Sequence, residues 1–135
     1  MIFGIGTDIT DNSRIEKILS KYPTLFLKKY FSEAEYFQYK NLDNVKFAKK
    51  ISKLYSGKEA FFKAIGTGLR FNMSFRDIVI LKDNLGKPYI KISGETLNYI
   101  EKNITSINNI KIHISLSDEI NSSIAFVIIE KIDIF

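Results

Sequence analysis

The segment that decides the fold covers residues 58–68 and joins a helical pattern to a glycine-rich stop. It reads Lys58-Glu59-Ala60-Phe61-Phe62-Lys63-Ala64-Ile65-Gly66-Thr67-Gly68. Apolar residues at helical spacing continue this pattern backwards, so we predict one long helix over residues 45–65. The glycines after Ile65 predict its C-terminal end. Gly57 lies inside the helix at a cost of roughly 1 kcal/mol relative to alanine, which suggests close packing of another backbone.

The rest of the chain predicts strands on either side of this helix, with shorter helices between them. β-branched and aromatic residues predict strands over 2–9, 75–81, 88–92, 110–116 and 124–132. Gly4 and Gly6 weaken the first strand or let another segment approach it closely. Capping residues and helical spacing predict helices over 14–19, 24–30, 33–39 and 94–102. This order predicts an α+β fold, with a mainly antiparallel sheet packed against the long helix, in one domain over residues 1–135.

Composition limits the class of protein. The 135 residues are 45% hydrophobic and 26% charged, which is typical of a globular domain. There is no secretory signal pattern, no apolar run long enough to span a membrane and no cysteine. We therefore expect a cytoplasmic protein without disulfides or thiolate ligands. The net charge of +5 favours an acidic partner, which could be nucleic acid, an acidic protein or a phosphorylated small molecule.

Two carboxylates and a lysine suggest a metal-assisted site. Glu59 and Lys63 are one turn apart on one helical face, and Asp8 interrupts the apolar run of the first strand. A charge in such a strand is costly unless it is paired or binds a metal. Two carboxylates suit Mg²⁺, which commonly adds water and substrate phosphate to its ligands. Lys63 would then neutralise a phosphate.

Simpler interpretations of these residues exist. The Glu59–Lys63 pair is also typical of a solvent-exposed ion pair that slightly stabilises a helix. His113 alternates with Ser115 and Ser117 along one strand face, which fits either a solvent-facing surface or a row of phosphate-binding groups. Taken together, the residues favour metal-dependent phosphoryl transfer. The chain has no GxxxxGK[ST] loop, so a P-loop enzyme is excluded.

Four motifs carry a resemblance to a known family over nearly the whole chain. The chain resembles the small bacterial 4'-phosphopantetheinyl transferases of the holo-acyl-carrier-protein synthase type. The motifs are Gly4-Ile5-Gly6-Thr7-Asp8-Ile9, residues 58–68, Asn84-Leu85-Gly86-Lys87-Pro88 and His113-Ile114-Ser115-Leu116-Ser117. Their order, their spacing and the length of the chain together make the resemblance specific.

The resemblance implies transfer of phosphopantetheine from coenzyme A to a serine of apo-acyl carrier protein, with adenosine 3',5'-bisphosphate released, in fatty acid biosynthesis. It implies that Asp8 and Glu59 bind Mg²⁺ and take part in catalysis with Lys63. Lys63, His113 and Lys58 would contact coenzyme A. Either Glu59 or a metal-bound water would deprotonate the serine.

The resemblance also has consequences for partners. It implies that Arg14 docks the acidic carrier protein, and that a homotrimer forms with active sites between neighbouring subunits. The apolar final strand is consistent with a sheet covered on both faces. Nucleic acid and membrane are not expected partners.

The chain departs from the family pattern at two positions. Many members have arginine where this chain has Leu54, beside Lys53, and many have a second histidine where it has Asp118. These departures motivate one alternative, a catalytically weakened homologue. A second alternative, a basic module that grips RNA or another polyanion, finds no RNP-like, KH-like or basic-stripe pattern to support it.

Overall fold

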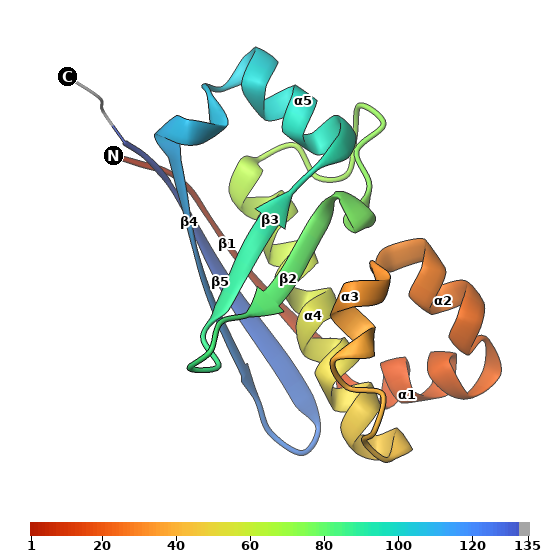
Figure 1. The fold of residues 1–135 in the computed structure, drawn as a ribbon. Helices are drawn as coiled ribbons and strands as arrows, with labels where there is room; N and C mark the ends of the chain where they lie inside the picture. The colour runs from red at the N-terminus through yellow and green to blue at the C-terminus, as the bar shows by residue number, and fades with distance from the viewer. Residues whose placement is uncertain (133–135) are drawn as a thin grey trace.

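The computed structural model describes residues 1–132 and has an α+β architecture (Figure 1). Its strands are β1 (Ile2–Asp11), β2 (Ile78–Lys82), β3 (Pro88–Ile92), β4 (Ile110–Asp118) and β5 (Ser122–Lys131). Its α-helices are α1 (Asn12–Lys21), α2 (Pro23–Tyr30), α3 (Glu33–Phe37), α4 (Asn44–Ile65) and α5 (Gly94–Asn103). Two 3₁₀ turns, η1 (Phe75–Asp77) and η2 (Ile107–Asn109), precede β2 and β4.

The main sheet is antiparallel, with β5 in the centre and the order β1-β5-β4. The predicted long helix, α4, packs against one face of it. Asp43 caps the helix N-terminus by accepting from the Lys46 amide at 2.9 Å. Gly66, in the left-handed conformation at φ 88°, ends it as predicted. The inner residues of β5, namely Ala125, Val127 and Ile129, are buried beneath it.

Two glycines let β1 approach α4 unusually closely. A Cβ atom added to Gly4 would lie 1.9 Å from the carbonyl oxygen of Ala64, and one added to Gly6 would lie 2.0 Å from that of Ala60. The predicted close approach at these glycines is confirmed, and its partner is the backbone of α4. Since β1 carries Asp8 two residues after Gly6, this contact sets the distance of Asp8 from the helix.

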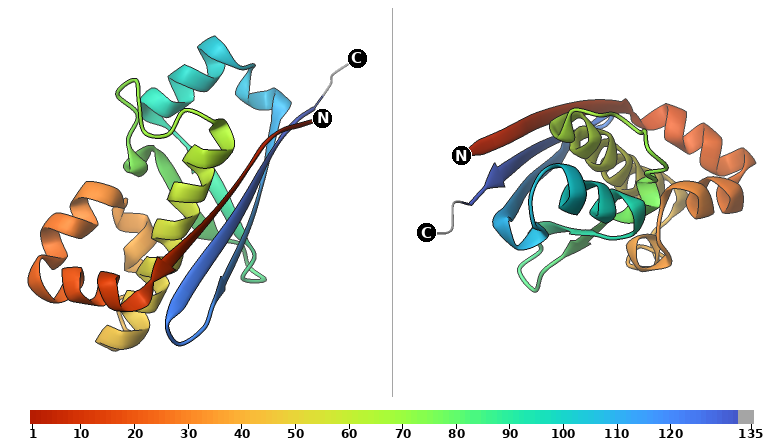
Figure 2. Two further views of the ribbon diagram at one scale, coloured as in Figure 1. Left: turned by 180° about the vertical axis from the view of Figure 1, so that it is seen from behind. Right: turned by 90° about the horizontal axis from the view of Figure 1, so that it is seen from above.

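Among residues 1–132, no helix covers the opposite face of the main sheet. Seen from behind, β1 and β5 lie in the foreground, uncovered (Figure 2). Ile5, Ile9, Ile124 and Phe126 on this outer face are all exposed. Both faces of β5 are apolar, and within the described part of the chain only the inner one is covered.

The remaining elements lie beside α4. The hairpin β2–β3 flanks it on one side, and α1–α3 cluster near its N-terminal half (Figure 1). The prediction that a strand begins at Phe75 was wrong, because Ser74 caps the turn η1 and extended structure starts at Ile78. The expected packing of another backbone against Gly57 is also wrong. Its close neighbours are side chains, including that of Ile80.

Candidate active site

Asp8 lies on the inner face of β1 and is paired with Lys63 of α4. The Asp8 Oδ1 atom accepts from Lys63 Nζ at 3.2 Å, and Oδ2 accepts from the Thr10 hydroxyl at 3.2 Å. Lys63 Nζ also donates to the carbonyl oxygen of Thr7 at 3.0 Å. The Lys63 side chain is 55% exposed, so its ammonium can turn towards a ligand. The predicted neighbourhood of Asp8 and Lys63 is therefore present.

Glu59 is half-buried and lies one helical turn before Lys63 on the same side of α4. The negative charge of its carboxylate acts on the hydroxyl of Tyr55, which lies one turn earlier in α4. Burial raises the pKa of the Tyr55 hydroxyl, and the Glu59 carboxylate raises it further. Among residues 1–132, no hydrogen-bond donor is directed at the Glu59 side chain, so its oxygens are available to a cation or a substrate proton.

Asp8 and Glu59, with Lys63 beside them, suit Mg²⁺ better than a softer metal. They offer hard carboxylate oxygens on two adjacent elements, with an exposed ammonium beside them. Within residues 1–132, no three histidine, aspartate or glutamate side chains cluster as a preformed cage. A site with two carboxylates is typical of Mg²⁺, which takes its remaining ligands from water and substrate phosphate. Lys63 would have to release Asp8 when the cation binds.

A basic pocket of about 320 Å³ opens on the other side of α4, between β4 and the hairpin β2–β3. Its charge comes from four lysines, Lys50, Lys53, Lys82 and Lys87. The sequence analysis noted only Lys53 and the turn containing Lys87. The signal was missed because the lysines come from three segments that are separate in sequence and meet only in the folded chain.

Of the two departures from the family pattern, Leu54 lines this pocket, and Asp118 pairs with the pocket residue Lys53. Lys53 Nζ lies 3.7 Å from Asp118 Oδ2, and the Lys53 side chain is 15% exposed and that of Asp118 28%. Burial lowers the pKa of Lys53, Lys50 adds to that effect, and Asp118 opposes it. Asp118 is thus the counter-ion of a pocket lysine, which explains how an anion is tolerated beside a basic site.

Lys58 lies in the interior, where the expected contact with coenzyme A is out of reach. Its side chain is fully buried and its Nζ is 2.7 Å from Glu35 Oε1. Nζ also donates to the carbonyl oxygens of Phe75 at 2.9 Å and Ile78 at 2.5 Å, which uses all three ammonium donors. Burial lowers the pKa of Lys58 to about 8, against the opposing effect of Glu35. The expectation for Lys58 is corrected, because the helix turns this residue towards α3 and β2.

His113 lies on the outer face of β4, where Nε2 and Glu130 Oε2 are 2.9 Å apart. This hydrogen bond lowers the pKa of Glu130. Asp8 is on the inner face of β1, at the far edge of the same sheet. A single chain therefore does not bring His113 and Asp8 together.

Arg14 lies on α1 and borders an open groove between α1, α2 and α4. Its guanidinium carbon is 5.7 Å from the centroid of the Tyr55 ring, which also lines the groove. Lys29 lines the same groove, and the apolar side chains of Tyr22 and Leu25 are exposed there. The groove combines positive charge with apolar area, which suits an acidic protein surface.

The carboxylates and the basic pocket occupy opposite sides of α4. At about 3.6 residues per turn, Glu59 and the pocket residue Lys50 project in opposite directions. Asp8 lies at the β1 edge of the sheet, and the pocket lies at the β4 edge, with β5 between them. One chain therefore carries both the carboxylates and the basic pocket, but it holds them on opposite sides of α4.

Comparisons with known proteins identify relatives of the whole chain. Residues 4–118 match the family model of the 4'-phosphopantetheinyl transferase superfamily. A holo-[acyl-carrier-protein] synthase of Pelagibacter ubique is 40% identical over 96% of this chain and 98% of its own.

Solved structures agree with this. A holo-(acyl-carrier-protein) synthase of Bacillus anthracis in complex with CoA (3',5'-ADP) is 31% identical, with a TM-score of 0.78 over 97% of this chain and 98% of that one. One of Helicobacter pylori in complex with coenzyme A is 30% identical, with a TM-score of 0.76 over 93% and 99%.

Proposed function

Since the chain belongs to the 4'-phosphopantetheinyl transferase superfamily, we propose that it transfers the 4'-phosphopantetheine group from coenzyme A to a serine of apo-acyl carrier protein. The observation that carries this proposal is the pairing of Asp8 with Lys63 beside Glu59, on a chain that also holds a pocket with four lysines. A carboxylate pair and a polyphosphate pocket are the two parts that such a transfer needs.

The reaction exchanges the phosphoanhydride bond of coenzyme A for a phosphoester bond to the serine. The serine oxygen forms a bond to the phosphorus on the pantetheine side of the pyrophosphate, and the bond from that phosphorus to the bridging oxygen breaks. Adenosine 3',5'-bisphosphate leaves with the bridging oxygen. The serine proton passes to a base, for which we propose Glu59, because its carboxylate has no competing donor among residues 1–132. Lys63 would offset the negative charge that develops on the phosphate oxygens.

We propose that Asp8 and Glu59 hold Mg²⁺ in the complex with coenzyme A. When bound, the cation would supply charge neutralisation and a fixed orientation for the pyrophosphate. Within residues 1–132, the carboxylates do not cluster with a third protein ligand, so the phosphate itself would complete the binding. Asp8 would then exchange Lys63 for the cation, and Lys63 would turn towards the substrate.

The basic pocket is the proposed binding place for the nucleotide part of coenzyme A. This part carries a 3'-phosphate and a pyrophosphate, and four lysine ammoniums are the matching charges. Tyr39 and Pro88 add apolar surface to the lining. The coenzyme complexes of the Bacillus anthracis and Helicobacter pylori relatives support a coenzyme site on this fold.

We also propose that the protein is a homotrimer and that each active site forms between two subunits. Its support is the separation of the two halves across α4, together with the exposed apolar face formed by Ile5, Ile9, Ile124 and Phe126. A neighbouring copy packed on this face would cover it and would bring its own pocket and His113 towards the carboxylates. Apolar area of this kind drives association between copies of one chain.

The groove at Arg14 is the proposed docking place for the carrier protein. Carrier docking there would lead towards Glu59, because Tyr55 lies next to both Arg14 and the Glu59 charge. We assign the reaction to fatty acid biosynthesis in the cytoplasm. Within residues 1–132, no helix is long and apolar enough to cross a membrane.

Release of adenosine 3',5'-bisphosphate tests the proposal. The protein would be incubated with coenzyme A, Mg²⁺ and apo-acyl carrier protein, and the bisphosphate would be measured by chromatography. We expect release in proportion to the carrier, and none from a carrier whose acceptor serine is replaced by alanine. Equal release of the bisphosphate with the alanine carrier would indicate hydrolysis of coenzyme A and would contradict the proposed transfer.

A further inference from the structure

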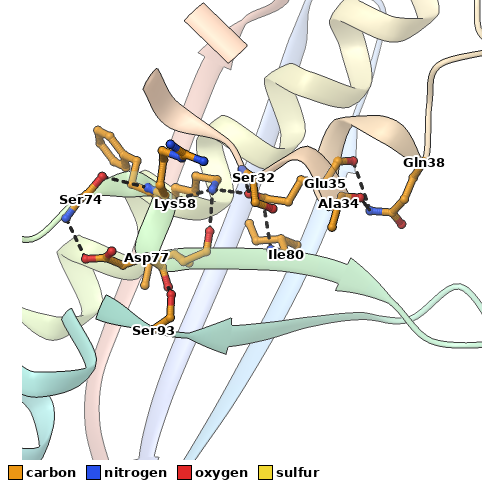
Figure 3. A network of polar contacts seen from close by, with 12 residues as sticks. Ser32, Ala34, Glu35, Gln38, Lys58, Ser74, Asp77, Ile80 and Ser93 are labelled. Atoms are coloured by element: carbon orange, nitrogen blue, oxygen red, sulfur yellow. Dashed lines mark hydrogen bonds and ion pairs between the residues drawn. The ribbon is translucent and has the colours of Figure 1, made fainter. Parts of the chain in front are cut away.

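The buried pair Glu35–Lys58 joins four elements, from α3 near the start of the chain to β2 in its second half. Glu35 comes from α3, Lys58 from α4, and their backbone partners from η1 and β2 (Figure 3). Both side chains are fully buried. Glu35 Oε1 also accepts from the Ser32 amide at 3.0 Å, and Oε2 accepts from the Ile80 amide at 3.1 Å. Each charged group is therefore fully engaged, as a buried charge requires.

The partners on β2 are the backbone groups that β3 cannot reach. In an antiparallel pair, the backbone groups of successive residues point to alternate sides. The carbonyl of Asp77 accepts from the Ser93 amide at 2.9 Å and so faces the β3 side. Ile78 and Ile80 face away from β3, towards Lys58 and Glu35. The two side chains thus take the place of a neighbouring strand along the free edge of β2.

This edge belongs to the wall of the basic pocket. Ile80, Leu81 and Lys82 of β2 line the pocket on one side, and Lys50 and Lys53 of α4 line it on the other. The Glu35–Lys58 pair bonds to the backbone of Ile80, which belongs to the β2 wall, and of Ile78, two residues before it. Among the described residues, Lys58 is the α4 side chain that bonds directly to the backbone of β2. Through the Ile80 amide, the pair therefore holds one residue of the pocket wall.

We propose that Glu35 and Lys58 are positioning residues, which hold the β2 wall of the pocket against α4 and so set its affinity for the nucleotide bisphosphate of coenzyme A. The inference rests on the proposed function, because it takes the pocket to be the nucleotide site. A buried ion pair is weak evidence of stabilisation, since apolar replacements of similar size are often tolerated. Its distinctive contribution is the set of directional bonds to the β2 edge.

Two double variants separate the hydrogen bonds from the packing. Glu35→Gln with Lys58→Gln keeps neutral donors and acceptors for the β2 edge, whereas Glu35→Met with Lys58→Met removes them at similar volume. The affinity for adenosine 3',5'-bisphosphate would be measured by titration calorimetry, beside thermal unfolding. We expect the glutamine pair to bind within about threefold of wild type and the methionine pair to bind at least tenfold more weakly.

A matched control distinguishes positioning from loss of stability. Ile129→Val shortens a buried side chain of β5, away from the pocket, and should lower the unfolding temperature without changing bisphosphate affinity. A folded methionine pair with wild-type affinity would overturn the inference. Wild-type protein that binds no bisphosphate would instead contradict the proposed function, and the inference would fall with it.

Hydrogen exchange tests the same coupling without any substitution. The Ile80 amide donates to Glu35, so its exchange rate reports on the β2 edge directly. We expect exchange of this amide to slow at least tenfold when adenosine 3',5'-bisphosphate fills the pocket. An unchanged rate at saturating bisphosphate would show that the edge and the pocket are not coupled, and would overturn the inference even if the methionine pair failed to fold.

Discussion

Gly6→Ala should damage the site through the backbone, without touching a catalytic side chain. The added methyl group would lie 2.0 Å from the carbonyl oxygen of Ala60 and 2.7 Å from the amide nitrogen of Ala64. Ordinary contact begins at 3.4 Å, and both neighbours are helix backbone that cannot rotate away. Strand β1 and helix α4 would therefore have to separate by about 1 Å or more, and such overpacking costs about 1–3 kcal/mol.

The separation should act on activity more strongly than on stability. Asp8 follows Gly6 on the same strand, and its contact with Lys63 spans the gap that would widen. A displacement of about 1 Å in a catalytic site can lower turnover about 100-fold. We expect a loss of kcat near this size and a decrease in melting temperature of about 3–15 °C. Steady-state kinetics and calorimetry of the purified variant would measure both.

Gly57→Ala is the matched control. Its added methyl group would meet Ile80 Cδ1 at 2.6 Å, a side-chain end that can turn aside, and alanine is favoured over glycine in a helix by about 1 kcal/mol. We expect kcat within about threefold of wild type. A Gly6→Ala protein with wild-type kcat and melting temperature would refute the argument that this close approach positions Asp8.

Three further substitutions test separate parts of the account. Glu59→Gln should lower kcat at saturating carrier protein by at least about 100-fold, and near-normal turnover would remove Glu59 from the mechanism. Arg14→Ala should raise the KM for carrier protein about two- to fivefold at low salt and less at high salt; an equal effect on coenzyme A would argue against docking. Phe126→Asp should put a charge on the exposed sheet face and yield monomers in sedimentation, and a stable trimer would exclude that face as the interface.

The local elements could be predicted because their signals are local. The long helix has apolar periodicity and a glycine stop, and the structure places it at Asn44–Ile65. The start of β2 was missed because Ser74 caps the N-terminus of a 3₁₀ turn, η1, which precedes the strand. Apolar spacing does not reveal such a cap.

The site could be predicted only where its residues share one segment or one adjacent strand. Glu59 and Lys63 are one turn apart, and Asp8 stood out as a charge in an apolar run. Lys58 was misplaced because its partner, Glu35, lies on another helix, and no local pattern reveals that the two are buried together. The pocket lysines were missed for the same reason, since only the folded chain gathers them.

The central claim is that this chain moves phosphopantetheine from coenzyme A to a carrier serine. Intact mass spectrometry of apo-acyl carrier protein tests it most directly, after incubation with the protein, coenzyme A and Mg²⁺ and in parallel with EDTA. We predict a mass increase of one phosphopantetheinyl group that EDTA abolishes. An unchanged mass, with a carrier that another transferase can modify, would contradict the claim.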